Sequence, residues 1–130
     1  MKKIKTISLL TLLAVALISC GQNSNSRSQL GKISAEKELK LALTDKTLHN
    51  VVDHKKIIIK DETTAVTIAE SILFCIYGKE KITKQRPYEI YNIDNYWIIY
   101  GTLPKGYVGG TFLIIIDSRD SKIIKITHGK

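Results

Sequence analysis

The sequence predicts an α+β domain in which one main amphipathic helix packs on a curved four-stranded antiparallel sheet. Between Pro87 and Thr127, four blocks of β-branched and aromatic residues alternate with turn residues, a pattern typical of consecutive antiparallel strands. Upstream, apolar residues between Ala65 and Ile76 recur at spacings of three and four, which indicates one apolar helix face. The composition, 44% hydrophobic and 25% charged, is that of an ordinary globular protein.

The predicted sheet is a β-meander in one continuous stretch of chain. Its turns are expected at residues 93–95, 103–106 and 118–121, where Asp, Asn, Pro, Gly and Ser gather. The strands between them are expected at residues 88–90, 96–103, 111–116 and 122–127. Gly109 and Gly110 precede the third strand, and we interpret them as a wide turn and bulge. A phosphate-binding loop would lead into a helix instead.

The main helix is expected to start at the capping residues Asp61, Thr63 and Thr64 and to end at Gly78. Asp and Thr side chains accept hydrogen bonds from the first backbone amides of a helix, and Gly readily adopts the left-handed conformation that ends one. The stripe predicted to face the sheet consists of Ala65, Ile68, Ala69, Ile72 and Ile76, with Val66 and Leu73 on its flank.

Phe74 and Cys75 fall outside or at the edge of this stripe. Phe74 lies opposite it, so that either the first helix or the loop over residues 79–86 covers the ring, or the ring faces a partner protein. Cys75 is expected to act as a small buried hydrophobe. A short extra helix is predicted upstream over residues 34–44, and residues 49–60 are expected to form a short strand or an extended lead-in.

The amino-terminal segment has the three parts of a secretory signal: a lysine-containing end, an apolar stretch over residues 7–18 and small residues after it. The stretch is too short to span a bilayer of about 30 Å comfortably. Leu17, Ser19 and Cys20 occupy the positions that resemble a bacterial lipobox. This resemblance implies that a diacylglycerol joins the Cys20 sulfur and that the signal is cut before Cys20.

The expected organisation is a lipoprotein signal peptide over residues 1–19, a lipidated Cys20 with a flexible tether over residues 20–33, and a single domain over residues 34–130. Residues 22–29 are polar and lack apolar side chains, so they cannot bury enough surface to order themselves. By analogy with lipoprotein sorting signals, we expect a membrane anchor facing the periplasm. Cys75 is then the sole thiol, so no intramolecular disulfide is expected.

The charge pattern gives no indication of nucleic-acid binding. The formal net charge is +8, but the lysines and arginines are scattered, whereas a nucleic-acid site clusters them on one element with aromatic residues between them.

No catalytic, cofactor or metal site is expected from the sequence. His49, His54 and His128 lack the spacing that places two ligands on one helix face. The sequence contains no GxSxG nucleophile motif, and Asp94 and Asp117 close strands as turn residues do.

Several short motifs resemble one protein family when they are taken in order. These are Tyr77-Gly78-Lys79 after the helix, Arg86-Pro87-Tyr88, a Trp strand before Gly101-Thr102-Leu103-Pro104, Gly109-Gly110 before an apolar strand, and His128-Gly129-Lys130 at the end. Over residues 59–130 the chain resembles the bacterial immunity proteins with the nuclear transport factor 2 fold, a cystatin-like cone, from polymorphic-toxin and contact-dependent competition systems. The resemblance implies a non-catalytic protein that binds a cognate toxin and blocks it.

With the lipobox, this resemblance predicts an immunity lipoprotein that occludes a toxin in the cell envelope without turnover. The expected toxin-binding surface is the set of turns around Lys105, Tyr107 and Arg119, where a basic rim and an exposed aromatic residue could meet an acidic cleft. Phe74 is a further candidate. Simple solvated turns remain the alternative interpretation of these positions.

Two other functional interpretations stay open. One is an envelope lipoprotein that binds a small ligand between helix and sheet, which would require polar groups converging inside. The other is a small enzyme of the same fold, for which His128, Asp117 and Tyr100 are the available residues.

Overall fold

The computed structural model describes residues 27–129, so the predicted signal peptide and Cys20 lie outside the described residues. The chain divides into two compact units, Met1–Thr47 and Leu48–Lys130. The first contains helix α1 (Gly31–Thr44), none of whose residues is buried. This helix begins before the predicted cap Ser34, which lies inside it. Within residues 27–129 no helix combines the length and apolarity that crossing a membrane would require.

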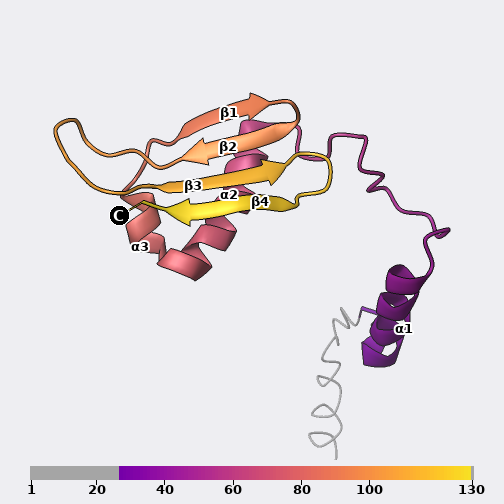
Figure 1. Cartoon of the computed structure of the whole chain (residues 1–130). Helices are drawn as coiled ribbons and strands as arrows, with labels where there is room; N and C mark the ends of the chain where they lie inside the picture. Colours follow the sequence, from indigo (N-terminus) through magenta and orange to yellow (C-terminus); the bar gives the residue numbers. More distant parts are fainter. Residues whose placement is uncertain (1–26, 130) are drawn as a thin grey trace, which may run out of the picture. The chain divides into compact units, whose positions relative to one another are not determined.

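The second unit contains the predicted β-meander (Figure 1). Its four antiparallel strands lie in the order β1-β2-β3-β4 in one open sheet. The strands are β1 (Glu89–Ile93), β2 (Tyr96–Tyr100), β3 (Phe112–Asp117) and β4 (Ile123–His128). β2 is shorter than predicted because the chain turns away beyond it, where the Thr102 amide donates to the Gln85 carbonyl at 2.9 Å. The α+β prediction is confirmed.

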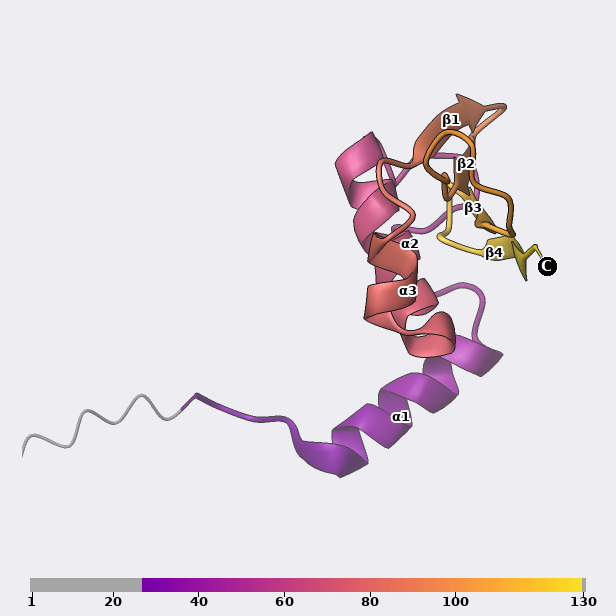
Figure 2. The same cartoon turned by 90° about the vertical axis from the view of Figure 1, so that its left-hand side faces the viewer.

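Helices α2 (Glu62–Tyr77) and α3 (Lys79–Thr83) lie on one side of this sheet (Figure 2). α2 begins as predicted, since the Asp61 side chain accepts hydrogen bonds from the Thr64 amide and hydroxyl, both at 2.8 Å. It ends at Gly78, whose φ is +87°. α3 occupies the segment that we expected to be a loop. The Ile82 side chain is fully buried, and this contact with the core holds the short helix in place.

The buried face of α2 is rotated relative to the predicted stripe. Ala65, Ala69 and Leu73 are its buried residues, whereas Ile76 is 53% exposed. Cys75 is exposed, so its expected role as a buried hydrophobe is wrong. The residues of α2 that face the core therefore recur at a spacing of four, from Ala65 through Ala69 to Leu73.

Phe74 also contacts the core. Its ring is partly buried and packs against the core cluster, rather than standing on the opposite side of the helix. Phe74 follows directly after the buried Leu73, so its side chain lies at the edge of the buried face. Whether Phe74 also contacts a partner stays a prediction.

The core lies between α2 and the sheet. It consists of Ile59, Ala65, Ala69, Leu73, Ile82, Trp97, Ile99, Phe112, Ile114 and Ile116. The lead-in over residues 48–60 forms neither helix nor strand but a series of bends, so the predicted short strand is absent. Its end is fixed by two amides, those of Ile58 and Ile59, which donate to the Ser118 carbonyl at 2.8 and 2.9 Å.

Gln85 is a buried polar residue that links the sheet to the segment after α3. Its Oε1 accepts from the Phe112 amide at 2.9 Å, and its Nε2 donates to the Lys81 carbonyl at 3.2 Å. A Cβ at Gly101 would lie 2.1 Å from this Oε1, so any larger residue at that position would displace the amide side chain. This close approach explains the Gly that ends the Trp strand.

Candidate functional site: the outer face of the sheet

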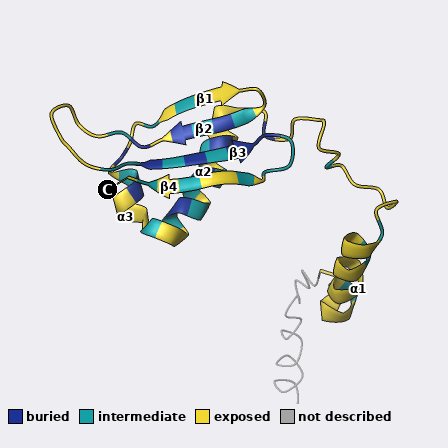
Figure 3. Ribbon diagram, viewed as in Figure 1, coloured by how far each residue is buried: buried dark blue, intermediate teal, exposed yellow. Residues whose placement is uncertain are grey.

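The sheet has a second face, on the side away from α2. Strand side chains alternate between the two faces, and burial follows that alternation along β2 and β3 (Figure 3). One row, formed by Tyr91, Ile98, Ile115 and Lys125, crosses all four strands through paired positions. We call the apolar side chains on this side the outer apolar face: Tyr91, Ile93, Tyr96, Ile98, Tyr100, Leu113, Ile115 and Ile124.

Several of these large side chains are open to solvent. Tyr91 is 48% exposed, Ile93 56% and Ile124 48%. An apolar depression of about 340 Å³ lies among them, lined by Ile93, Asp94, Tyr96, Ile98, Ile115 and Ile124. Antiparallel sheets ordinarily place polar residues on the solvated face, and contiguous exposed apolar patches mark interaction sites. The outer apolar face therefore has the character of a binding surface.

Sequence reasoning did not identify these residues, although a signal was present. The strands Tyr96–Tyr100 and Phe112–Asp117 are apolar at almost every position, rather than at every second one. A strand that is apolar on both sides needs something to cover each side. In the second unit, helix α2 covers only one of these two sides.

The structure separates the predicted site residues instead of gathering them. Lys105 and Tyr107 lie on the long loop between β2 and β3, which extends beyond the strand ends (Figure 1). Both are exposed, as is the neighbouring Val108. Arg119 lies in the turn between β3 and β4, at the other end of β3. The loop and the turn therefore border opposite ends of the sheet.

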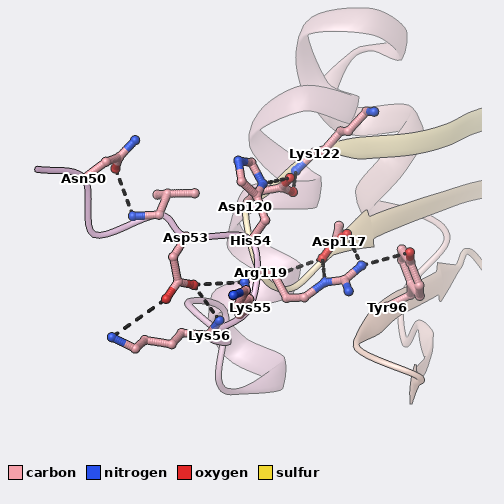
Figure 4. A network of polar contacts seen from close by, with 11 residues as sticks. Asn50, Asp53, His54, Lys55, Lys56, Tyr96, Asp117, Arg119, Asp120 and Lys122 are labelled. Atoms are coloured by element: carbon pink, nitrogen blue, oxygen red, sulfur yellow. Dashed lines mark hydrogen bonds and ion pairs between the residues drawn. The ribbon is translucent and has the colours of Figure 1, made fainter. Parts of the chain in front are cut away.

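Arg119 is engaged within the molecule (Figure 4). Its Nε and Nη2 donate to the two carboxylate oxygens of Asp117 at 2.8 and 2.6 Å. Nη2 also donates to the Tyr96 hydroxyl at 3.0 Å, and the guanidinium lies 5.4 Å from the centre of that ring. The Arg119 guanidinium lowers the pKa of Asp117 to about 2. Arg119 thus fixes Tyr96 at the margin of the outer apolar face.

A second group of polar contacts ties the lead-in to the same turn (Figure 4). His54 Nδ1 lies 2.9 Å from Asp120 Oδ2, and the Lys122 amide donates to Asp120 Oδ1 at 2.9 Å. The Lys122 amide is the main cause that lowers the pKa of Asp120. These contacts are structural, and within residues 27–129 no group of His, Cys, Asp and Glu could hold a metal ion.

The three residues available to an enzyme do not meet. His128 pairs with Phe112 at the start of β3, whereas Asp117 ends that strand. Tyr100 points to the outer apolar face and is 38% exposed. The His128 ring instead lies beside Tyr77, with 5.2 Å between ring centres. No catalytic pair of the kind that an enzyme would require is formed by these residues.

The interior also lacks the convergent polar groups that a small ligand would need. The buried polar residues are Gln85, Asp117 and Ser118. Ser118 Oγ donates to the Asn95 carbonyl at 2.6 Å, and the other two are bonded as described above. In the described part of the chain, every buried side-chain nitrogen and oxygen has a hydrogen-bond partner. These observations disfavour an internal ligand site.

Comparison with known proteins places the helix-and-sheet unit in a family. The sequence model of a family described as "NTF2 fold immunity protein" matches residues 64–130, which is more than half of the chain. Two curated relatives come from Escherichia coli (strain K12). "Uncharacterized protein YhhH" is 31% identical over 74 residues, and "Uncharacterized protein YbbC" is 30% identical over 73 residues.

These alignments cover 56% and 55% of this chain, and 58% and 60% of the respective relatives. No solved structure matches the chain. The family match contains most of α2, all of α3 and the four strands that form the outer apolar face. This chain is therefore a member of the NTF2-fold immunity protein family.

Proposed function

We propose that this immunity protein binds and occludes a cognate bacterial toxin in the cell envelope, and so protects the producing cell or its kin. The observation that carries the proposal is the outer apolar face, a partly exposed apolar surface on a member of an immunity family. Inhibition is by occlusion, since the groups available to an enzyme are dispersed over the unit. One inhibitor molecule then blocks one toxin molecule.

The proposed location rests on the lipobox-like sequence that ends at Cys20. Several acyl chains on one residue give a stable anchor, because each buried methylene contributes about 0.8 kcal/mol. The polar tether after Cys20 keeps the inhibitor near the membrane and lets it reorient, which raises its local concentration there. A tethered inhibitor outside the cytoplasm meets toxins that act in the envelope or pass through it. Damage to the cell wall or membrane is the activity that it would block.

The proposed contact surface combines the outer apolar face with the exposed loop that carries Lys105 and Tyr107. Aromatic side chains such as Tyr91 and Tyr107 are common anchors in protein interfaces. Lys105, Lys122 and Lys125 are exposed lysines that have no carboxylate partner among residues 27–129. Because these charges border the apolar surface, a toxin with an acidic margin fits it best. Arg119 contributes by holding Tyr96.

The test is survival of cells exposed to the toxin encoded beside this gene. Three strains are compared: one with the gene deleted, one with the full-length gene, and one that expresses the protein without residues 1–20. We expect survival only with the full-length gene. Equal survival of all three strains would end the immunity proposal. Protection by the cytoplasmic form alone would place the toxin's target inside the cell.

Anchoring is tested separately by the substitution Cys20→Ser. The lipid cannot attach to the serine, so the protein should move from the membrane fraction to the soluble fraction. Immunoblotting of the two fractions measures this shift, and Cys75→Ser is the matched control because it leaves the lipobox intact. If Cys20→Ser stays in the membrane fraction, the protein is not anchored by a lipid on Cys20.

A further inference from the structure

The two edge strands of the sheet differ in how well they are protected. β1 and β4 each pair with one neighbour, so each presents backbone amides and carbonyls on its outer side. Natural sheets protect such edges with lysines, prolines, bulges or covering segments. β4 carries Lys125 near its centre, its pairing with β3 is irregular between Ile115 and Ile116, and His128 at its end contacts Gln85 and Tyr77.

β1 has none of these protections. Its sequence, EIYNI, contains no lysine or proline, and its register with β2 is regular from Glu89 to Ile93. Among the described residues, no backbone hydrogen bond joins β1 to any segment other than β2. In Figure 1 this strand lies at one edge of the sheet, opposite β4. β1 is therefore an open edge on which another strand could pair.

The hairpin geometry identifies the backbone groups that are free. Asp94 and Asn95 both have positive φ, 50° and 67°, as in the two-residue turn that closes a regular hairpin. The pair next to such a turn is hydrogen-bonded, and bonded pairs then alternate. Glu89, Tyr91 and Ile93 therefore bond to β2, which leaves the amides and carbonyls of Ile90 and Asn92 directed to the open edge.

A contact between β2 and β3 supports this assignment. The Gly101 amide donates to the Phe112 carbonyl at 3.0 Å, so the odd-numbered residues along β2 bond to β3. The even-numbered residues of β2 then face β1, and their partners in the register are Glu89, Tyr91 and Ile93.

A groove runs beside the open edge. It has a volume of about 590 Å³ and is lined by Glu62, Thr63, Val66 and Thr67 from α2 and by Arg86, Pro87, Tyr88 and Ile90. Its wall is held in place around Glu70, whose Oε1 accepts from Arg86 Nε at 2.9 Å and from the Tyr88 hydroxyl at 2.7 Å. A strand paired with β1 would direct alternate side chains into this groove.

We propose that the open edge of β1 binds an extended segment of the toxin as a fifth strand, with apolar side chains at alternate positions lying against Val66 and Ile90. This inference rests on the proposed function, since the toxin is the partner. The remaining side chains of the toxin segment, at the positions between these, point to the other side of the sheet and extend the outer apolar face next to Tyr91 and Ile93. Main-chain hydrogen bonds supply the affinity in this mode, and the groove supplies the specificity.

The first test compares Asn92→Pro with Asn92→Ala in the full chain, with the toxin that the survival assay identifies as the probe. Proline removes the outward amide, and an edge strand tolerates it because that amide has no partner within the sheet. We expect Asn92→Pro to weaken toxin binding by about tenfold, the effect of losing one backbone hydrogen bond and its alignment. Asn92→Ala keeps the amide and should bind within about twofold of the unsubstituted protein.

The second test is hydrogen exchange of the unsubstituted protein, which does not depend on how a variant folds. The amides of Ile90 and Asn92 should exchange rapidly in the free protein and become protected in the toxin complex. The β4 amides serve as the internal reference. Toxin binding without this protection, together with full binding by Asn92→Pro, would overturn the edge proposal and leave the proposed function intact. Absence of any toxin binding by the unsubstituted protein would instead overturn the proposed function.

Discussion

Ile114 and Ile115 are identical side chains at adjacent positions of β3, yet they lie in opposite environments. Ile114 is fully buried beneath α2, whereas Ile115 lines the depression on the outer apolar face. The strand sequence does not distinguish them, so the position of α2 alone determines which face becomes the core. An apolar second face gives no advantage in water. The outer face therefore stays available in water for the partner that the proposed function requires.

The largest expected effect comes from introducing a charge at each of these two positions. Ile114→Asp should prevent folding, because it places an unpaired carboxylate in the core. Ile115→Asp should fold, since its carboxylate can reach water, and it should reduce toxin binding. Circular dichroism melting curves measure the first effect and a binding assay the second. Equal loss of structure in both variants would mean that the two faces are not distinct.

A smaller effect distinguishes the two sides of α2. Leu73→Ala should lower the free energy of unfolding by about 2–5 kcal/mol, because it opens a cavity at a fully buried site. Ile76→Ala removes an isoleucine that is 53% exposed and should lower it by less than about 1 kcal/mol. Urea denaturation measures both values. If Ile76→Ala lowers the free energy of unfolding more than Leu73→Ala does, the helix faces the sheet with the residues that the spacing predicted.

The fold could be predicted largely because its signals are local. The turns between strands carry Asp, Asn and Gly, and the cap at Asp61 and the stop at Gly78 depend on neighbouring residues. The rotation of α2 could not be predicted in this way, since Leu73 and Ile76 are three positions apart and a small rotation of the helix decides which of them faces the sheet. α3 was missed because its five residues are held by the burial of Ile82, which is a tertiary contact.

The candidate site was less predictable, because its properties come from contacts between distant segments. Arg119 and Asp117 are two residues apart in the sequence, but only the fold places Tyr96 beside the guanidinium. Lys105 and Tyr107 are exposed as expected, and their contact with a toxin stays a prediction. The open edge of β1 depends on strand order, which a sequence pattern does not define.

An intermediate effect concerns Trp97, the core-face neighbour of the outer-face residue Ile98. Its indole Nε1 donates to the Ile59 carbonyl at 3.1 Å, which joins the lead-in to the sheet. Trp97→Phe keeps much of the ring but removes this donor and leaves a buried carbonyl without it. The free energy of unfolding should fall by about 1–3 kcal/mol. Ile98→Val, on the other face of the sheet, is the matched control. An equal loss of unfolding free energy in that variant would argue against a special role for the indole hydrogen bond.

The smallest effect is a pH dependence at the margin of the outer apolar face. Asp117 has a pKa of about 2 in the folded protein, below its ordinary value of 3.8, because Arg119 stabilises the carboxylate. The native state therefore binds this proton less readily than the unfolded chain does. The contribution to stability is complete above pH 3.8 and is lost as the pH falls towards 2.

Asp117→Asn should remove this dependence, because the amide does not titrate in that range. We therefore expect the melting temperatures of Asp117→Asn and the unsubstituted protein to converge between pH 4 and pH 2, with the variant less stable at neutral pH. Asp94→Asn, a substitution in the turn between β1 and β2, should leave the acid dependence in place. If the melting temperature of Asp117→Asn falls with acid as steeply as that of the unsubstituted protein, other carboxylates cause the dependence. The Asp117–Arg119 pair would then have only the geometric role of holding Tyr96 at the edge of the outer apolar face.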